Sequence, residues 1–296
     1  MAAARRAISD RCRARFGMAV TPVPSMLSPA ELDATGMIFA AEMYGVQLDL
    51  LASALGLTVT QASALVVRWR TAGHAEDGRL SPGPRWVWLT RAGLAAAGLP
   101  YRPGQPGLSR LTHLRAVAAA RLALEATPHY QRASAYWRSE RRLRHRIGGR
   151  AGLREHVPDA EVHWPDGGGA DWDGECWAIE AELTPKTLPR TMEIMRELLT
   201  RTGDYGGGPT AIVTPGHPPR HARAVYLCSP SASRVVTRAR TELGPLGARI
   251  EIRPLPAAAA FPPPPPPAGS AAAPANAQLV AARPTGRYQI PRGKER

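Results

Sequence analysis

The chain has 296 residues and a formal charge of +14, from 38 Lys+Arg against 24 Asp+Glu. This length allows two small domains. The longest apolar runs are too short for a membrane-spanning helix, and the three scattered cysteines indicate free thiols rather than a disulfide framework. Basic proteins of this kind often bind polyanions, so we expect a cytoplasmic protein that meets nucleic acid and no membrane.

The charge is unevenly distributed along the sequence. Residues 28–100 carry five cations and six anions, a net −1. Residues 101–156 carry twelve and three, a net +9, and residues 157–187 carry one and eight, a net −7. Cations bind phosphates and carboxylates bind divalent ions, so the alternation fits a nucleic-acid site beside a metal centre. Two solvated faces of opposite sign are the alternative.

The N-terminal third predicts a small helical domain with a hairpin. Residues 1–27 are predicted to be a basic, flexible arm, and Ser28 and Pro29 are predicted to begin the first helix. The following elements are predicted to be a helix over 48–55 ended by Gly56, a helix begun by Thr60 and running to about 71, strands over 75–80 and 85–89, and a short helix begun by Thr90. Together they predict a winged helix-turn-helix DNA-binding domain over 28–100.

We expect the third helix of this domain to contact double-stranded DNA. Its N-terminal half supplies the side chains that normally enter the major groove, and Gln and Arg can each contact a base edge. The candidate DNA-binding residues are Thr60, Gln61, Ser63, Arg68, Arg70 and Arg85, with Arg141 and Arg144 of the basic block supplying phosphate contacts. A winged helix used only for protein contacts is the alternative, because the domain is nearly neutral.

Strands alternate with helices in the remainder of the chain. A Pro/Gly linker precedes a helix over 109–127 and an arginine-rich helix over 135–146. The later elements are predicted to be strands over 159–164 and 176–183, a helix over 187–202, strands over 211–214 and 224–228, a helix over 231–243 and a strand over 249–255. This order predicts an α/β (α+β) domain over 108–255. Residues 256–296 are Ala/Pro-rich and predicted to be a disordered tail.

Acidic residues on two of these strands are candidate metal ligands. Glu180 and Glu182 share one face of their strand because side chains alternate along it. If the two strands pair, Asp159 and Glu180 converge at one end, and Lys186 follows at the entrance to the next helix. Convergent carboxylates beside a lysine can hold Mg²⁺ and position water for phosphodiester hydrolysis. Solvated strand carboxylates opposite arginines are the alternative.

Short motifs in this part resemble a known family. The segments 137–144, 157–160 and 178–186 look like the replication-relaxation family of actinobacterial plasmid and mobile-element proteins, and the similarity covers about residues 28–255. The resemblance implies a winged helix followed by a PD-(D/E)XK nuclease-like domain. Asp159 would match the first acidic position of that pattern and Glu180 the second, while Glu140 would match the helix carboxylate that some lineages use as a metal ligand.

The chain departs from the nuclease pattern at one position. The pattern requires Lys two residues after the second acid, where this chain has Glu182, and Lys186 is the available substitute. The resemblance therefore leads us to expect a DNA-binding protein that acts in plasmid or integrative-element replication, maintenance or transfer. An active Mg²⁺-dependent endonuclease using Asp159, Glu180 and Lys186 is one alternative. A non-catalytic adaptor for a relaxase or replication initiator is the other.

Overall fold

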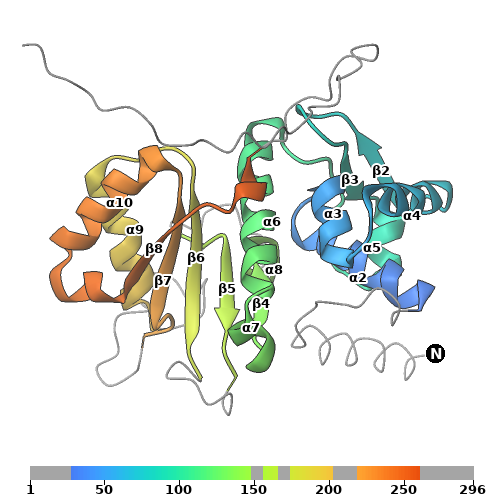
Figure 1. Cartoon of the computed structure of the whole chain (residues 1–296). Coiled ribbons are helices and arrows are strands. Elements are labelled where there is room, and N and C mark those ends of the chain that lie inside the picture. The colour runs from blue at the N-terminus through green and yellow to red at the C-terminus, as the bar shows by residue number, and fades with distance from the viewer. Residues whose placement is uncertain (1–27, 148–155, 166–173, 203–218, 261–296) are drawn as a thin grey trace, which may run out of the picture. The chain divides into compact units, whose positions relative to one another are not determined.

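The computed structural model describes residues 28–147, 156–165, 174–202 and 219–260. Within these ranges the chain is a mixed α/β protein with helices and two sheets (Figure 1). No single helix in the described part is long and apolar enough to cross a membrane. The predicted arm over 1–27, the predicted strand over 211–214 and residues 261–296 of the predicted tail lie outside the described residues.

The first part, residues 28–100, has the predicted helices and hairpin, and also a two-residue strand, β1, that was not predicted. They are α2 (Pro29–Glu42), β1 (Val46–Gln47), α3 (Leu48–Leu55), α4 (Val59–Thr71), β2 (Ala75–Gly78), β3 (Trp86–Leu89) and α5 (Arg91–Ala96). The three strands form an antiparallel sheet in the order β1-β3-β2. Ser28 and Thr90 cap α2 and α5 as predicted. Gly56 ends α3 in a left-handed conformation with φ 63°, which glycine adopts without steric cost.

The start of α4 corrects one prediction. Thr58, and not Thr60, is the N-cap: its hydroxyl accepts a hydrogen bond from the Gln61 N–H at 3.2 Å. The Gln61 side-chain oxygen in turn accepts from the Thr58 N–H at 2.9 Å. This capping box requires Glu or Gln three residues after the cap. Thr58 has Gln61 at that distance, whereas Thr60 has only Ser63.

The second part is built on a five-stranded sheet. Its elements are η2 (Leu108–Arg110), α6 (Leu111–Glu125), α7 (Pro128–Arg132), β4 (Tyr136–Ser139), α8 (Glu140–Arg146), β5 (Ala160–His163), β6 (Cys176–Glu182), α9 (Leu188–Thr200), β7 (Arg223–Cys228), α10 (Pro230–Glu242), η3 (Gly244–Arg249), β8 (Ile250–Pro254) and η4 (Ala257–Ala259). The sheet order is β4-β5-β6-β7-β8. Strands β4, β5 and β6 are antiparallel, whereas β7 and β8 run parallel to β6.

The predicted helix over 135–146 is wrong in its first half. Residues Tyr136–Ser139 form the edge strand β4, and the helix begins only at Glu140. Trp137 and Ser139 are buried while their neighbours are half-buried, which is the two-residue period of a strand. Ser139 then caps α8 by accepting from the Arg142 N–H. Aromatic residues and an internal Ser cap therefore outweigh the helix propensity of the arginines that follow.

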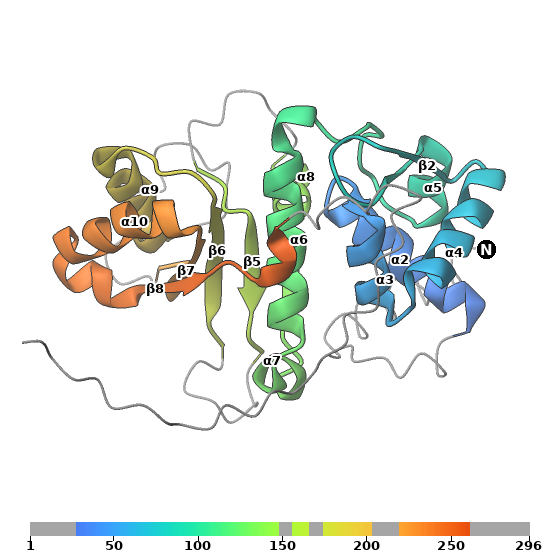
Figure 2. The ribbon, with the colours of Figure 1, turned by 45° about the horizontal axis from the view of Figure 1, so that its top comes forward.

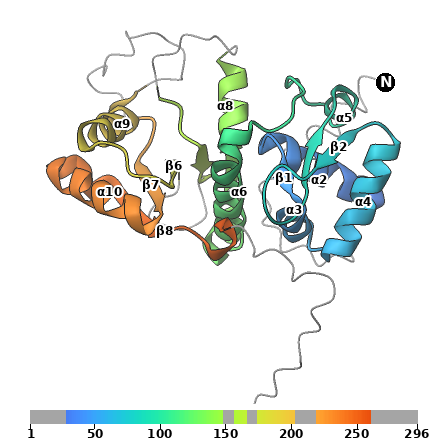
Figure 3. The same ribbon diagram turned by 90° about the horizontal axis from the view of Figure 1, so that it is seen from above.

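The five-stranded sheet is covered by helices on both faces. Helix α6 lies along one face, and α9 and α10 pack side by side on the other (Figures 2 and 3). Alternate residues of β6 divide accordingly: Ile179 and Ala181 join the apolar cluster that contains α6, whereas Ala178 joins the cluster that contains α9 and α10. Glu180 and Glu182 therefore lie on the α9 side of the sheet.

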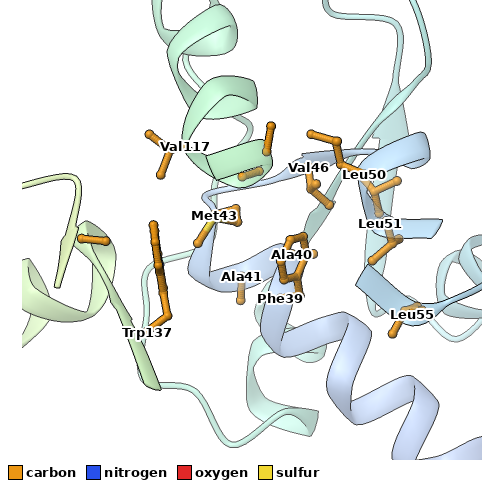
Figure 4. Packing of buried hydrophobic residues seen from close by; sticks show 14 of the residues in the cluster. Phe39, Ala40, Ala41, Met43, Val46, Leu50, Leu51, Leu55, Val117 and Trp137 are labelled. Atoms are coloured by element: carbon orange, nitrogen blue, oxygen red, sulfur yellow. The ribbon is translucent and has the colours of Figure 1, made fainter. Parts of the chain in front are cut away.

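Helix α6 also packs against the first part of the chain. Phe39, Met43 and Val46 of the first part share one apolar cluster with Val117 of α6 and Trp137 of β4 (Figure 4). The predicted domains 28–100 and 108–255 therefore share one buried core. Residues 256–260, the start of the predicted tail, include η4, where Ala259 is buried in the same cluster.

Candidate functional site

Asp159 and Glu180 lie together at one end of the paired strands β5 and β6. Asp159 immediately precedes β5, and the register places Ala160 opposite Ile179, so Asp159 adjoins Glu180. Oδ2 of Asp159 accepts a hydrogen bond from the Ala181 N–H at 2.8 Å. Glu180 is buried, whereas Asp159 is half-buried, with 12% of its side chain exposed. Asp159 and Glu180 are thus neighbours across the β5–β6 pair.

Asp159 forms an ion pair with His113 of α6. Nε2 of His113 lies 2.7 Å from Oδ1 of Asp159. Burial opposes ionisation of Asp159, but the hydrogen bond and charge of His113 outweigh it and hold the pKa of Asp159 below its ordinary value. Burial likewise favours the neutral imidazole, but Asp159 outweighs it and raises the pKa of His113. The pair is thus stabilised in its charged form.

Glu180 has a histidine partner of its own. Nε2 of His156 lies 2.7 Å from Oε1 of Glu180. Burial raises the pKa of Glu180 and the charges of Asp159 and Glu182 add to that effect, so that His156 only partly offsets it. The pKa of His156 is raised because Glu180 outweighs the burial of the ring. Two neighbouring carboxylates with opposite shifts are typical of a site at which protons or cations are exchanged.

Glu182 and Tyr226 complete this acidic centre. The Lys186 ammonium donates to the Glu182 carboxylate, so the lysine at the helix entrance is held by this acid. Tyr226 lies opposite Glu180 on β7 and is 1% exposed. Its hydroxyl has no hydrogen-bond partner in the described part of the chain. Burial and the charges of Glu180 and Glu182 raise the pKa of Tyr226.

Glu140 lies near this centre but is held by arginines. Its N–H donates to the Asp159 carbonyl at 2.8 Å. Its carboxylate accepts from Arg110 at 2.6 Å and from Arg144 at 2.7 Å. Glu140 and Asp159 line one small hollow together with His113 and Arg110. The structure thus places Glu140 beside Asp159, with its carboxylate oxygens engaged by two guanidinium groups.

The predicted DNA-binding residues of α4 are exposed. Thr60, Gln61 and Ser63 lie on the outer side of the helix, next to Val59 and Val67, which are 49% and 54% exposed. Arg68 pairs with Asp33 at 2.8 Å. Arg70 and Arg85 both pair with Asp77, at 2.8 and 2.9 Å. The side chains of the three arginines are about half exposed, but Asp77 is only 5% exposed, so Arg70 and Arg85 also neutralise a buried carboxylate.

Arg141 and Arg144 lie at a separate basic groove of about 540 Å³. Arg141 is fixed between the rings of Tyr44 and Tyr101, and it donates to the Ala41 carbonyl at 2.7 Å. This makes Arg141 a structural connection to α2. Arg144, 47% exposed, remains open to the groove although it pairs with Glu140. The groove also contains Arg110 and His145.

Sequence reasoning missed the histidines of the acidic centre. His113 comes from α6, forty-six residues before Asp159, and no spacing links the two positions. His156 precedes Val157 and Pro158 and carries no motif of its own. An inward-facing polar residue among the apolar positions of α6 was the available signal for His113, because a buried polar group needs a partner.

The sequence was compared with family models, curated proteins and solved structures. No family model matches it, and neither a curated protein nor a solved structure matches it.

Proposed function

We propose that this protein binds double-stranded DNA through α4, as a replication-relaxation-type protein acting in plasmid or integrative-element replication, maintenance or transfer. The observation that carries the proposal is the α3–α4 pair. The chain turns by 102° between the two helices across a three-residue connection that contains Gly56. Helix-turn-helix units have helices at about 90–120° joined by three or four residues, often with glycine.

The surroundings of α4 support this use. Thr60 and Ser63 near its start are small, uncharged and exposed, which suits entry into a major groove. The hairpin β2–β3 follows directly, as the wing does in a winged helix. Arg70 and Arg85 flank it and are about half exposed, so they can reach the phosphate backbone beside the groove.

Duplex binding by a charge variant tests the proposal. We expect the full chain to bind a short DNA duplex with an affinity that falls as salt rises, because phosphate contacts release counterions. Ser63→Glu places an anion on the exposed face of α4 and should weaken binding at least about tenfold. Thr237→Glu makes the same charge change at an exposed position of α10 and should bind like the parent chain. Undetectable or salt-independent binding would instead favour the adaptor for a relaxase or replication initiator.

A Mg²⁺-dependent endonuclease is a second candidate, favoured by the acidic centre. Asp159 and Glu180 offer hard oxygen ligands. The Tyr226 hydroxyl, which has no hydrogen-bond partner among the described residues, lies near the same carboxylates, so these residues fit an oxygen-coordinated divalent cation. Asp159 and Glu180 would hold the ion, which would supply Lewis-acid stabilisation of the phosphate. Lys186, whose ammonium donates to the Glu182 carboxylate in this structure, would place that ammonium beside the scissile phosphate.

Nicking of supercoiled plasmid DNA with Mg²⁺ tests this second candidate. Asp159→Asn should abolish nicking, because it removes the charge that His113 and the cation share. Glu193→Gln is the matched control, since it makes the same chemical change at a carboxylate of α9 that is 63% exposed. Nicking that survives Asp159→Asn unchanged would exclude the catalytic role while leaving the proposed DNA binding untouched.

A further inference from the structure

A second cluster of metal-ligating side chains lies toward the other end of β5 and β6. Ligand atoms of Glu161, Cys176 and His221 all lie within 4.8 Å of one another. Glu161 and His221 are fully buried, and Cys176 is half-buried. The three residues come from β5, the first residue of β6 and the segment just before β7. One ion at this point would therefore connect three neighbouring strands.

His163 lies beside this group and offers a further donor. Its Nε2 lies 3.6 Å from Sγ of Cys176 and 2.9 Å from Oε2 of Glu161. Tetrahedral Zn²⁺ with bonds of about 2.0–2.3 Å separates its ligand atoms by about 3.3–3.8 Å. The sulfur–nitrogen distance already matches such an edge, and the shorter contacts to Glu161 need to lengthen by only about half an ångström. A Cys, His and carboxylate set is also the chemistry that zinc prefers.

The orientation of His221 provides independent support. Its Nδ1 lies 2.9 Å from the Leu198 carbonyl, and a carbonyl can only accept, so Nδ1 carries a proton. Nε2 then points at Oε1 of Glu161 at 2.9 Å. Histidines that ligate metals commonly donate their other N–H to a backbone carbonyl in this way, which directs the remaining lone pair at the ion. A cation between Nε2 of His221 and Oε1 of Glu161 would be bound by both atoms.

Glu161 also has two guanidinium neighbours. It accepts a bidentate contact from Arg220, at 2.6 and 2.9 Å, and Arg138 lies 3.8 Å away. Zn²⁺ would bind as Cys176 loses its thiol proton to solvent and a Zn–S bond forms. The thiolate and Glu161 carboxylate then balance the ion, with Arg220 remaining outside the ligand shell.

We propose that Glu161, Cys176 and His221, with His163 as the fourth donor, form a structural Zn²⁺ site that joins β5, β6 and the start of β7. Four protein ligands leave no open position for substrate, which is typical of structural and not catalytic zinc. The site is separate from the Asp159–Glu180 centre, so it does not depend on the proposed DNA binding or nuclease activity.

Metal analysis of the full chain tests the site. After dialysis against metal-free buffer, elemental analysis should find about one zinc per chain. Co²⁺, used as the spectroscopic probe in the zinc-free protein, should give a thiolate-to-Co²⁺ charge-transfer band. Cys176→Ser should abolish that band and weaken zinc binding by more than the ~10–100-fold that loss of an outer-shell partner causes. Asp159→Asn should leave zinc content unchanged, which separates this site from the acidic centre.

Two other thiols provide the matched control. The sequence has three cysteines, so a Cys12→Ser/Cys228→Ser chain keeps Cys176 as its single thiol. That chain should retain the thiolate-to-Co²⁺ band. Because Cys176 is then the single thiol, the band would identify it as the sulfur ligand even if Cys176→Ser fails to fold. A parent chain without zinc and without a sulfur–Co²⁺ band, or a band that persists in a folded Cys176→Ser chain, would overturn the proposal.

Discussion

Two histidines determine the charge state of the acidic centre. His113 holds Asp159 ionised, whereas His156 only partly offsets the burial of Glu180. The two acids thus differ in the ease with which they give up a proton, although both lie at the same strand end. The two histidines place positive charge beside the carboxylates, as a bound metal ion would. A cation that bound there would therefore take over the role of the imidazolium charges.

The His113–Asp159 pair predicts a pH-dependent stability. The folded pKa of His113 lies above its ordinary 6.5. Its contribution is therefore fully present below about pH 6.5 and is lost as pH rises through the folded pKa. Urea unfolding should give a free energy that declines over this range in the parent chain. In His113→Gln it should decline less steeply, and the variant should be less stable by about 1–3 kcal/mol at pH 6.

An exposed histidine supplies the control for this measurement. His129→Gln changes the same residue type on α7, away from the acidic centre, and should keep the slope of the parent chain. The role assigned to His113 would be wrong if His113→Gln and His129→Gln gave the same pH profile.

At the scale of elements, the start of α4 gives a sharp prediction. Thr58→Ala removes the capping hydroxyl and should lower the free energy of unfolding by about 0.5–2 kcal/mol. Thr60→Ala, two residues later, should change it little, because its side chain is exposed and makes no capping contact. Thermal or urea unfolding of the two variants measures the difference. Equal losses in both would contradict the cap at Thr58.

Local signals predicted most elements of the fold. Caps at Ser28, Thr90 and Thr187 and the left-handed Gly56 gave correct helix ends, because these signals depend only on neighbouring residues. The alternation of β5 and β6 likewise gave the correct strands. The edge strand β4 was missed because it is four residues long and runs directly into an arginine-rich helix.

The candidate sites were predictable only where their residues share a strand pair. Asp159 and Glu180 meet because β5 and β6 are adjacent and antiparallel, which the sequence pattern anticipates. His113 reaches Asp159 only through the packing of α6 across the sheet, and His221 reaches Glu161 only because β7 joins β6 in parallel. Such contacts depend on tertiary topology, which no local spacing encodes.

At the scale of the whole molecule, Arg115 connects distant parts of the chain. It lies on α6, is 2% exposed, and makes a bidentate contact with Asp49 of α3 at 3.0 and 2.8 Å. It also donates to the Gln47 side chain, and its Nε donates to the Ala260 carbonyl at 2.9 Å. One buried guanidinium thus joins the first part, α6 and the end of the described chain.

This network predicts that the two parts unfold together. Arg115→Met keeps the apolar stem of the side chain but removes all of these hydrogen-bond donors. It should lower the free energy of unfolding by about 3 kcal/mol. This value is near the lower end for a broken buried ion pair, because Asp49 is partly exposed. Hydrogen exchange should show protection falling in 28–100 and in 108–255 alike, since both share the core around Val117. Arg196→Met, at an exposed position of α9, should leave exchange unchanged. Faster exchange confined to 28–100 would mean that the two parts are independent folding units and that the shared core does not couple them.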